Sequence, residues 1–367
     1  MDVFSSPAFD DHEQVLFFYD RSSGLKAIVA LHDTTLGPAV GGCRFWPYAS
    51  DMEALTDVLR LSKGMTYKAA MAGLPYGGGK TVIIGDPKAM RSEALFRALG
   101  RAIHTLSGTY YTGEDVGTSP QDMNWAGQET PYVLGRSQGG SGDPSPVTAR
   151  GVLLGIKAAV RHRFGRDELQ GVRVAIQGLG HVGGNLATLL AAEGAQLILA
   201  DIDAERATRR AAQLGARQVG CEEIIAVDAE VFAPCALGGV INDRTLGQLS
   251  CDIVAGAANN QLQEPRHGTA LHARGILYAP DYVTNAGGLI NIAQELRPGG
   301  YDRARALAHV ATIETTLAEI FERSEREDRP THEIADQVAE ERIRAARRAK
   351  DAAYHALGAV AEQAAAG

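Results

Sequence analysis

Residues 172–203 read VRVAIQGLGHVGGNLATLLAAEGAQLILADID, and they decide how the second half of the chain folds. A short apolar run leads into Gly178-x-Gly180-x-x-Gly183, and the residues that follow have the apolar spacing of a helix. A second apolar run, LILA, ends at Asp201, 18 residues beyond Gly183. This order of strand, glycine-rich turn, helix and acidic strand end is typical of a dinucleotide-binding βαβ unit.

Each part of this fingerprint has a physical task. Gly178 permits the tight turn, Gly180 lets the backbone approach a pyrophosphate, and Gly183 allows close packing of helix and strand. Asp201 can accept hydrogen bonds from ribose hydroxyls and would repel a 2′-phosphate, which favours NAD over NADP. The predicted cofactor contacts along the loop are Gly178, Leu179, Gly180, His181, Val182 and Gly183, with His181 acting only through its backbone.

The pattern around the fingerprint predicts the domain organisation. From residue 172 onward, short apolar runs alternate with helical patterns, as in a parallel sheet with helices on both faces. The stretch GGSGDPSPV (139–147) is typical of an interdomain hinge, and Thr148 is expected to open a helix. We predict an α/β fold of two domains, with C-terminal helices at about 335–367 that pack back on the first domain. The predicted domains are an N-terminal α/β substrate-binding, catalytic and oligomerisation domain (1–138) and a Rossmann-type NAD-binding domain (139–334).

Composition excludes several classes of function. A net charge of −8 disfavours a nucleic-acid partner, and 367 residues exceed what a single core usually fills. No signal-peptide pattern and no apolar stretch of membrane-spanning length occur in the sequence, so we expect a cytoplasmic protein without a membrane partner. The four cysteines have no C-x-x-C spacing, so we expect no metal and reduced thiols.

The first domain is expected to mix strands and helices. Its predicted elements are a hairpin (15–33), a helix (51–73), a strand (81–86), a helix (92–106) and a strand that runs into a loop (110–120). Asp51 and Ser92 are the expected N-caps of the two helices.

The stretch GLPYGGGKT (73–81) resembles a phosphate-binding loop but has the wrong spacing. That loop needs a glycine five residues before the Gly-Lys-Thr tail, and Leu74 occupies the position. The residues after Lys80 read as an apolar strand instead of the required helix. A lysine enclosed by glycines and apolar residues gives up its proton more readily and can act as a base, and a carboxylate can share that proton. We expect the glycines to let substrate and nicotinamide approach Lys80.

Longer motifs make the chain recognisable. It resembles the glutamate/leucine/phenylalanine/valine dehydrogenase family of NAD(P)-dependent amino-acid dehydrogenases along almost its whole length, and within that family it resembles leucine dehydrogenases most. The motifs that carry this resemblance are GPAVGGCRFW (37–46), GMTYKAAMAGLPYGGGKTVIIGDP (64–87), EDVG (114–117), FAPCALGG (232–239), GAANNQL (256–262) and YAPDYVTNAGGLIN (278–291), together with the NAD fingerprint.

The resemblance implies a role for individual residues. Lys68 matches the lysine that pairs with the substrate α-carboxylate, Lys80 the general base, and Asp115 the aspartate that assists proton transfer at the amino group. Gly42 matches a backbone contact to substrate. Positions lining the cofactor cleft are matched by Arg44, Thr148 and Asn260. The implied reaction is the reversible oxidative deamination of an L-amino acid to a 2-oxo acid and ammonia, in a homo-oligomer that is an octamer or a dimer.

The expected substrate is set by the side-chain pocket. Glutamate-specific members carry a lysine where this chain has Val40, and an acidic side chain without that cation would be rejected by desolvation. The other pocket positions, Gly113, Leu289 and Ile292, are small or apolar. Leucine and other branched aliphatic amino acids are favoured, although glycine at position 113 is also typical of phenylalanine-type members. A non-catalytic NAD-binding regulator would be expected to lack Lys80 or Asp115, and both are present.

Overall fold

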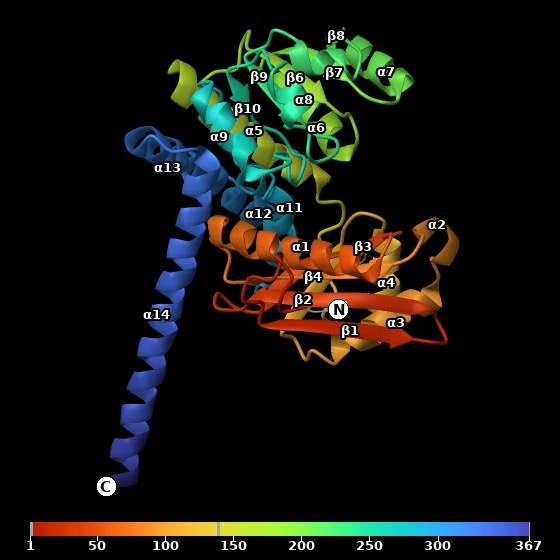
Figure 1. Cartoon of the computed structure of the whole chain (residues 1–367), viewed down its shortest axis with the longest axis vertical. Coiled ribbons are helices and arrows are strands. Elements are labelled where there is room, and N and C mark those ends of the chain that lie inside the picture. The colour runs from red at the N-terminus through yellow and green to blue at the C-terminus, as the bar shows by residue number, and fades with distance from the viewer. Residues whose placement is uncertain (1–2, 138–139, 367) are drawn as a thin grey trace. The chain divides into compact units, whose positions relative to one another are not determined.

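The structure is a computed structural model that describes residues 3–137 and 140–366, and the chain divides into two compact units (Figure 1). Unit 1 contains residues 1–142 and 337–367, and unit 2 contains residues 143–336. The predicted boundary between residues 138 and 139, and the first residue of the predicted hinge, lie outside the described residues and stay predictions. The predicted two-domain α/β class is confirmed.

Unit 1 is built on a five-stranded sheet in the order β1-β2-β4-β3-β5. The predicted hairpin is confirmed, because β1 and β2 pair antiparallel, whereas β3 lies parallel to both β4 and β5. The strands are β1 (Gln14–Asp20), β2 (Leu25–Asp33), β3 (Ala39–Trp46), β4 (Gly77–Ile84) and β5 (Tyr110–Glu114). Strand β4 begins four residues before the predicted start at residue 81, so Lys80 lies within a strand.

Four helices accompany this sheet before the chain passes into unit 2. They are α1 (Asp51–Met71), α2 (Pro87–Met90), α3 (Glu93–His104) and α4 (Pro120–Ala126). Ser92 caps α3 by accepting the N–H of Leu95, as predicted. The predicted cap Asp51 is wrong, because Ser50 accepts the N–H of Glu53 and Asp51 is the first helical residue.

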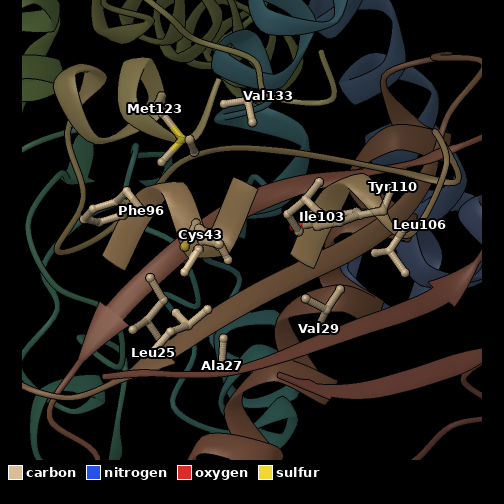
Figure 2. Close-up of a cluster of buried hydrophobic side chains, with 14 of the residues drawn as sticks. Leu25, Ala27, Val29, Cys43, Phe96, Ile103, Leu106, Tyr110, Met123 and Val133 are labelled. Carbon is tan, nitrogen blue, oxygen red and sulfur yellow. The ribbon is translucent and has the colours of Figure 1, made fainter. Parts of the chain in front are cut away.

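The sheet of unit 1 buries both of its faces. Helix α1 covers one face and α3 the other, and successive residues of β2 point to opposite sides. Ala27 and Val29 pack in the cluster that contains α3, with Cys43 and Phe96 beside them (Figure 2). Ile28 packs in the second cluster, against α1. Full burial of large apolar side chains contributes roughly 1.5–3 kcal/mol each, which fixes α1 and its functional residues against the sheet.

Unit 2 contains the predicted Rossmann-type domain. Its six strands lie in the order β11-β10-β9-β6-β7-β8, and all neighbouring strands are parallel. The strand order reverses direction between β6 and β9, the point at which such sheets bind ligands. The strands are β6 (Arg173–Gln177), β7 (Gln196–Ala200), β8 (Arg217–Gln218), β9 (Val231–Pro234), β10 (Ile253–Val254) and β11 (Leu277–Tyr278).

The helices of unit 2 connect and flank these strands. They are α5 (Ser145–Phe164), α6 (His181–Ala192), α7 (Ala204–Leu214), η1 (Glu223–Ala226), α8 (Asp243–Leu246), α9 (Pro265–Ala273), α10 (Asp281–Thr284), α11 (Gly287–Ala293), η2 (Gln294–Leu296), α12 (Arg303–Val310) and α13 (Thr312–Glu327). Helix α5 begins three residues before the predicted Thr148, whose hydroxyl donates back to the peptide oxygen of Pro144 at 3.0 Å. Because Ser145 and Pro146 already adopt helical geometry, Thr148 lies inside the first turn.

The last helix, α14 (Thr331–Ala366), begins in unit 2 and continues into unit 1. Within unit 1 it contacts the C-terminal end of α1, where Arg342 donates to the peptide oxygen of Met71 at 2.9 Å. The Tyr67 hydroxyl lies 3.1 Å from the carboxylate of Glu340. Among all helices that the structure describes, none is long and apolar enough to cross a membrane.

Candidate active site

The centre of the candidate site is an ion pair between two buried side chains. Nζ of Lys80, on β4, lies 2.8 Å from Oδ2 of Asp115, which directly follows β5. The two side chains are 6% and 17% exposed, so the charges are well shielded from solvent. The sequence named both residues separately, and the fold brings them into direct contact across the parallel strands.

The environment of Asp115 keeps its carboxyl group ionised. Burial alone would raise the pKa of Asp115, but the charges of Lys80 and Arg44 outweigh burial and lower the pKa to about 2. Nε of Arg44 lies 3.3 Å from Oδ2 of Asp115, the same oxygen that Lys80 contacts. Asp115 is therefore charged throughout the neutral range, as a fixed counter-ion to Lys80.

Gly42 leaves the space that this pair occupies. A Cβ atom added at Gly42 would lie 2.7 Å from Cβ of Asp115, 2.8 Å from the peptide oxygen of Glu114 and 3.3 Å from Nζ of Lys80. Two of these separations are shorter than real Cβ contacts allow. Any side chain at position 42 would displace Asp115, so the backbone at Gly42 borders the ion pair directly.

The predicted substrate residues of unit 1 share the sheet face that α1 covers. Val82 packs against α1, and side chains alternate along β4, so Lys80 points to the same face as Val82. On neighbouring parallel strands Val40 pairs with Gly78, and Gly42 pairs with Gly113. Paired residues of parallel strands point to the same side, so Val40, Gly42 and Gly113 also lie on this face.

Lys68 lies on α1, the helix that covers this face. It lies half-buried in the last turn of α1, whose neighbouring residues Tyr67, Ala69 and Ala70 are buried. Its peptide oxygen accepts the N–H of Ala72 at 2.9 Å, which closes the helix. The apolar run around Lys68 thus contains residues that are buried where α1 packs on the sheet. Lys68 and Lys80 belong to the same unit.

The glycines before Lys80 are required by the packing of the protein itself. A Cβ at Gly78 would lie 2.0 Å from the peptide nitrogen of Thr66 on α1, and one at Gly79 would lie 2.8 Å from the Tyr110 ring. Both side-chain positions are therefore filled by other parts of unit 1. Our expectation that these glycines clear space for substrate is wrong, because their role is to let α1 and Tyr110 approach β4.

Gly113 differs from the other glycines on this face, because it has room for a methyl group. A Cβ added there would come no closer than 3.7 Å to the peptide oxygen of Leu134 and 3.9 Å to its Cβ. Both distances are ordinary van der Waals contacts. The side of Gly113 that faces Lys80 and Gly42 thus has unfilled volume, which alanine would reduce without a clash.

The loop 178–183 of unit 2 has the geometry that a pyrophosphate needs. Gly178 has a φ of +95°, and a Cβ at Gly183 would lie 2.0 Å from the peptide oxygen of Gly178. At Gly180 an added Cβ would meet nothing within 4 Å of the described chain. Gly180 is also the N-cap of α6, and no side chain in the described part of the chain caps that end. The first N–H groups of α6 are therefore directed to an open position suited to a phosphate.

Asp201 is held in place by the fingerprint loop. Its Oδ2 accepts the N–H of Leu179 at 2.6 Å, and its Oδ1 accepts the N–H of Asp203 at 2.8 Å. The guanidinium of Arg206 lies 3.4 Å from Oδ1. The acidic group therefore lies next to the glycine turn, where a ribose bound by this loop would meet it. His181 and Val182 form the start of α6.

Three further predicted residues lie on α5 and α11 of unit 2. A Cβ at Gly288 would lie 2.8 Å from Oγ1 of Thr148, so the glycines that open α11 seat this helix against the start of α5. Leu289 is buried and Ile292 is half-buried on α11.

Asn260, the remaining predicted cofactor contact, is exposed in the loop after β10 and has a φ of +51°. Its peptide oxygen accepts the N–H of Gly239 at 2.7 Å.

The cysteines take no part in this arrangement. All four lie within the described ranges and none is in a disulfide. Cys43 is completely buried in the core of unit 1, and burial raises its pKa well above the ordinary range (Figure 2). Burial also raises the pKa of Cys235 to about 12. Neither thiol is a candidate nucleophile at neutral pH.

Sequence reasoning missed two residues that belong to the site. Asp57 on α1 accepts from Nη1 of Arg44 at 2.9 Å, and Tyr48 donates to the same carboxylate oxygen of Asp57 at 2.6 Å. No motif marks either residue, and their connection to Asp115 runs through Arg44. The one feature of the sequence that could have indicated this contact is the carboxylate of Asp57, which lies near the start of the predicted helix 51–73.

Comparisons with known proteins show the family to which the chain belongs. Residues 12–132 match the family model described as "Glu/Leu/Phe/Val dehydrogenase, dimerisation domain", and residues 139–205 and 198–365 match that of "Glutamate/Leucine/Phenylalanine/Valine dehydrogenase". The chain is 53% identical over 352 residues to a leucine dehydrogenase of Geobacillus stearothermophilus, covering 95% of each chain. It is 48% identical over 349 residues to a phenylalanine dehydrogenase of Caldalkalibacillus thermarum, covering 92% of this chain and 94% of the other.

A solved structure supports the same assignment. The crystal structure of L-tryptophan dehydrogenase from Nostoc punctiforme matches with a TM-score of 0.81 and 46% identity, covering 92% of this chain and 97% of the other. The predicted family resemblance is thus confirmed. The protein belongs to the glutamate/leucine/phenylalanine/valine dehydrogenase family and is an amino-acid dehydrogenase.

Proposed function

We propose that the protein catalyses the reversible, NAD-dependent oxidative deamination of a branched-chain aliphatic L-amino acid, with L-leucine as the favoured substrate. The products are the 2-oxo acid and ammonia. The relatives named leucine dehydrogenases are 51–54% identical to this chain, against 48% for the phenylalanine and tryptophan dehydrogenases, which supports the choice of leucine.

The observation that carries this proposal is the buried ion pair of Lys80 and Asp115. A pair of this kind, with a glycine backbone at its edge, can act on a small substrate and exclude bulk water. Lys68, from the helix above the same face, is suited to bind the α-carboxylate, because an ammonium group is a compact partner for a carboxylate. With the carboxylate bound there, the amino acid is oriented by its main-chain groups.

The residues of the chain divide the chemistry between them. NAD, when bound, supplies the acceptor for the hydride from the substrate Cα. Lys80, in its unprotonated form, takes a proton from the water that attacks the resulting iminium carbon, and it returns a proton as ammonia leaves. Because the pKa of Asp115 is about 2, we assign Asp115 to stabilising the Lys80 ammonium rather than to carrying the proton itself.

The choice of NAD over NADP rests on Asp201. Its carboxylate lies beside the loop that would hold the pyrophosphate, and the Leu179 N–H fixes its orientation. A 2′-phosphate at this position would meet a negative charge, whereas ribose hydroxyls would find an acceptor. The open position at Gly180 and the uncapped start of α6 fit the pyrophosphate itself. Thr148, Asn260 and Arg44 remain proposed cofactor contacts.

The residues proposed to contact the substrate side chain are Val40 and Gly113 in unit 1, and, separately, Leu289 and Ile292 in unit 2. All four are apolar or small, which suits an uncharged side chain. Phenylalanine is the second candidate, and the specific observation in its favour is the unfilled volume beside Gly113. One methyl group changes such a preference by only ~1–3 kcal/mol.

Assembly into a homo-oligomer is part of the proposal. Residues 12–132 match a model described as a dimerisation domain, and β1 forms an edge of the unit 1 sheet. We propose a dimer or an octamer. The mass of the purified protein in solution, measured by light scattering, distinguishes these two states from a monomer.

The function is tested by assaying a panel of L-amino acids with NAD and with NADP. The proposal predicts the highest kcat/KM for leucine with NAD, lower values for valine, isoleucine and phenylalanine, and none for glutamate. A higher kcat/KM for phenylalanine would select the second candidate. No amino-acid-dependent reduction of either coenzyme would reject the proposal.

A further inference from the structure

Behind the Lys80–Asp115 pair lies a chain of hydrogen bonds that the reaction as proposed does not use. Tyr48 donates to Oδ2 of Asp57 at 2.6 Å, and Nη1 of Arg44 donates to the same oxygen at 2.9 Å. Nε of Arg44 then donates to Oδ2 of Asp115 at 3.3 Å. The chain therefore runs from α1 through β3 to the carboxylate that Lys80 contacts.

An arginine is better suited than a lysine to the position between Asp57 and Asp115. Its guanidinium has donors in a rigid fork, so one group can bind two carboxylates that lie in different directions. The Arg44 side chain is 19% exposed and that of Asp57 is 27% exposed, so solvent competes only weakly for these bonds. Burial and the hydrogen bond to Asp57 raise the pKa of Tyr48, which keeps the hydroxyl protonated and donating.

The two cations contact the same oxygen of Asp115 but differ in their chemistry. Lys80 must lose and regain a proton during turnover, whereas Arg44 keeps its charge at every pH at which the protein is folded. If Lys80 were the only partner of Asp115, each loss of its proton would leave a buried carboxylate without a counter-charge, which is costly. With Arg44 in place, Asp115 retains one cationic partner throughout.

We propose that Arg44, held by Asp57 and Tyr48, is a positioning residue that keeps Asp115 charged and in place while Lys80 changes its protonation state. This inference rests on the proposed role of Lys80 as the base. It assigns Arg44 a function within unit 1, in addition to the cofactor contact that its family position implies. It also makes Asp57 and Tyr48 residues that support Asp115 through Arg44, although neither touches the reacting atoms.

The other ionisable groups around Asp115 do not replace this function. Burial raises the pKa of Cys43 and of Tyr110, so both stay uncharged at neutral pH. Asp122 forms its own ion pair with Arg91 at 3.0 Å. The ionisable groups on the surrounding elements are Cys43 and Arg44 on β3, Lys80 on β4, Tyr110, Tyr111 and Glu114 on β5, Asp51, Glu53, Asp57, Arg60, Lys63, Tyr67 and Lys68 on α1, and Tyr48 and Asp122.

The inference predicts changes of opposite sign for two substitutions. Arg44→Gln removes a positive charge near Lys80, so the measured titration midpoint of Lys80 should move to higher pH. Asp57→Asn removes a negative charge but keeps an acceptor for Tyr48 and Arg44, so Lys80 should lose its proton at lower pH. Tyr48→Phe removes one hydrogen bond without changing any charge, and it serves as the matched control with a smaller shift than either.

The ionisation of Lys80 can be followed without relying on turnover. The sequence contains only seven lysines, at positions 26, 63, 68, 80, 88, 157 and 350. Protein labelled with ¹³C at the lysine Cε atoms gives few NMR signals, and Lys80→Arg identifies the one from Lys80. The titration midpoint of that signal is measured in the wild type and the three variants, alongside the pH dependence of kcat/KM for leucine and NAD.

Opposite shifts of the Lys80 midpoint in Arg44→Gln and Asp57→Asn would establish the inference, even if leucine proved not to be a substrate. Unchanged midpoints, or shifts in the same direction, would overturn it. If Arg44→Gln fails to fold, the test is the Lys80 midpoint in Asp57→Asn. The inference holds if that midpoint moves to lower pH by more than it does in Tyr48→Phe, and it fails otherwise. A raised KM for NAD in Arg44→Gln with an unmoved midpoint would show that Arg44 is a cofactor contact only. Failure of the proposed function is recognised separately, by absence of leucine turnover in the wild type.

Discussion

Nζ of Lys80 lies 2.8 Å from Oδ2 of Asp115, and both groups are enclosed by the sheet of unit 1. The contact depends on three parallel strands, because β4 supplies the lysine, β5 leads to the aspartate, and β3 lies between them. On β3, position 42 must lack a side chain for the pair to form.

Gly42→Ala should lower kcat/KM for leucine by roughly 10²-fold while the protein stays folded. The added Cβ would lie 2.7 Å from Cβ of Asp115, which must move away from Lys80. A misplacement of about 1 Å in a catalytic group is expected to have an effect of this size. Steady-state kinetics and a thermal melting curve measure activity and folding separately.

The matched control for this substitution is Gly247→Ala. Gly247 has a φ of −69°, and a Cβ there would meet nothing within 4 Å of the described chain. The kcat/KM of Gly247→Ala for leucine should equal that of the wild type. Wild-type activity in Gly42→Ala would show that the ion pair tolerates displacement and is not the catalytic centre.

Gly113→Ala should raise the ratio of kcat/KM for leucine to that for phenylalanine by about tenfold. The new methyl group fits, since its nearest neighbours would lie 3.7 and 3.9 Å away, but it occupies volume that an aromatic ring would need. The KM for NAD should not change, which serves as the internal control. A ratio that stays constant or falls would place the substrate side chain elsewhere.

Asp201→Asn should shift coenzyme preference towards NADP. Asparagine can still accept the Leu179 N–H but no longer repels a 2′-phosphate, and Arg206, which keeps its ion pair with Asp203 at 3.1 Å, remains as a positive charge nearby. The ratio of kcat/KM for NADP to that for NAD should rise by at least about tenfold, since like charges in contact are strongly unfavourable. Adding Arg206→Ala should reverse part of this gain. An unchanged ratio would mean that Asp201 does not face the ribose.

The lowered pKa of Asp115 predicts how its contribution to stability depends on pH. A carboxyl group whose pKa falls from 3.8 to about 2 on folding stabilises the native state above pH 4, and this contribution is lost as the pH falls towards 2. Asp115→Asn should therefore lower the free energy of unfolding by about 2 kcal/mol equally at pH 7 and pH 5. The difference should shrink at pH 3. Urea unfolding at the three pH values checks this, and a difference that grew towards pH 3 would contradict the assigned shift.

Local patterns in the sequence predicted those parts of the structure that depend on neighbouring residues. The strand, glycine turn and helix around Gly178 need only a few consecutive residues, and so does the Ser92 cap. The start of β4 was missed because glycines have weak strand preference. Their place in the strand follows from tertiary contacts to Thr66 and Tyr110, which no local pattern reveals.

The candidate site shows the same division. Lys80 and Asp115 stood out because of their motifs, but their contact joins residues 35 positions apart on different strands. The partners of Arg44 were not predictable, because Asp57 lies on a helix and Tyr48 in a loop, without a motif. Long-range ion pairs depend on how elements pack, and packing is not encoded in any short stretch.

Lys80→Ala tests the proposed role of Lys80 as the base most directly. Leucine-dependent reduction of NAD by the purified variant is measured together with NAD binding by calorimetry. We expect a loss of kcat of at least about 10²-fold, since the proposed general base is gone, with the Kd for NAD unchanged because the proposed dinucleotide loop 178–183 lies in unit 2. A variant that bound NAD normally and kept nearly full activity would contradict the central role of Lys80.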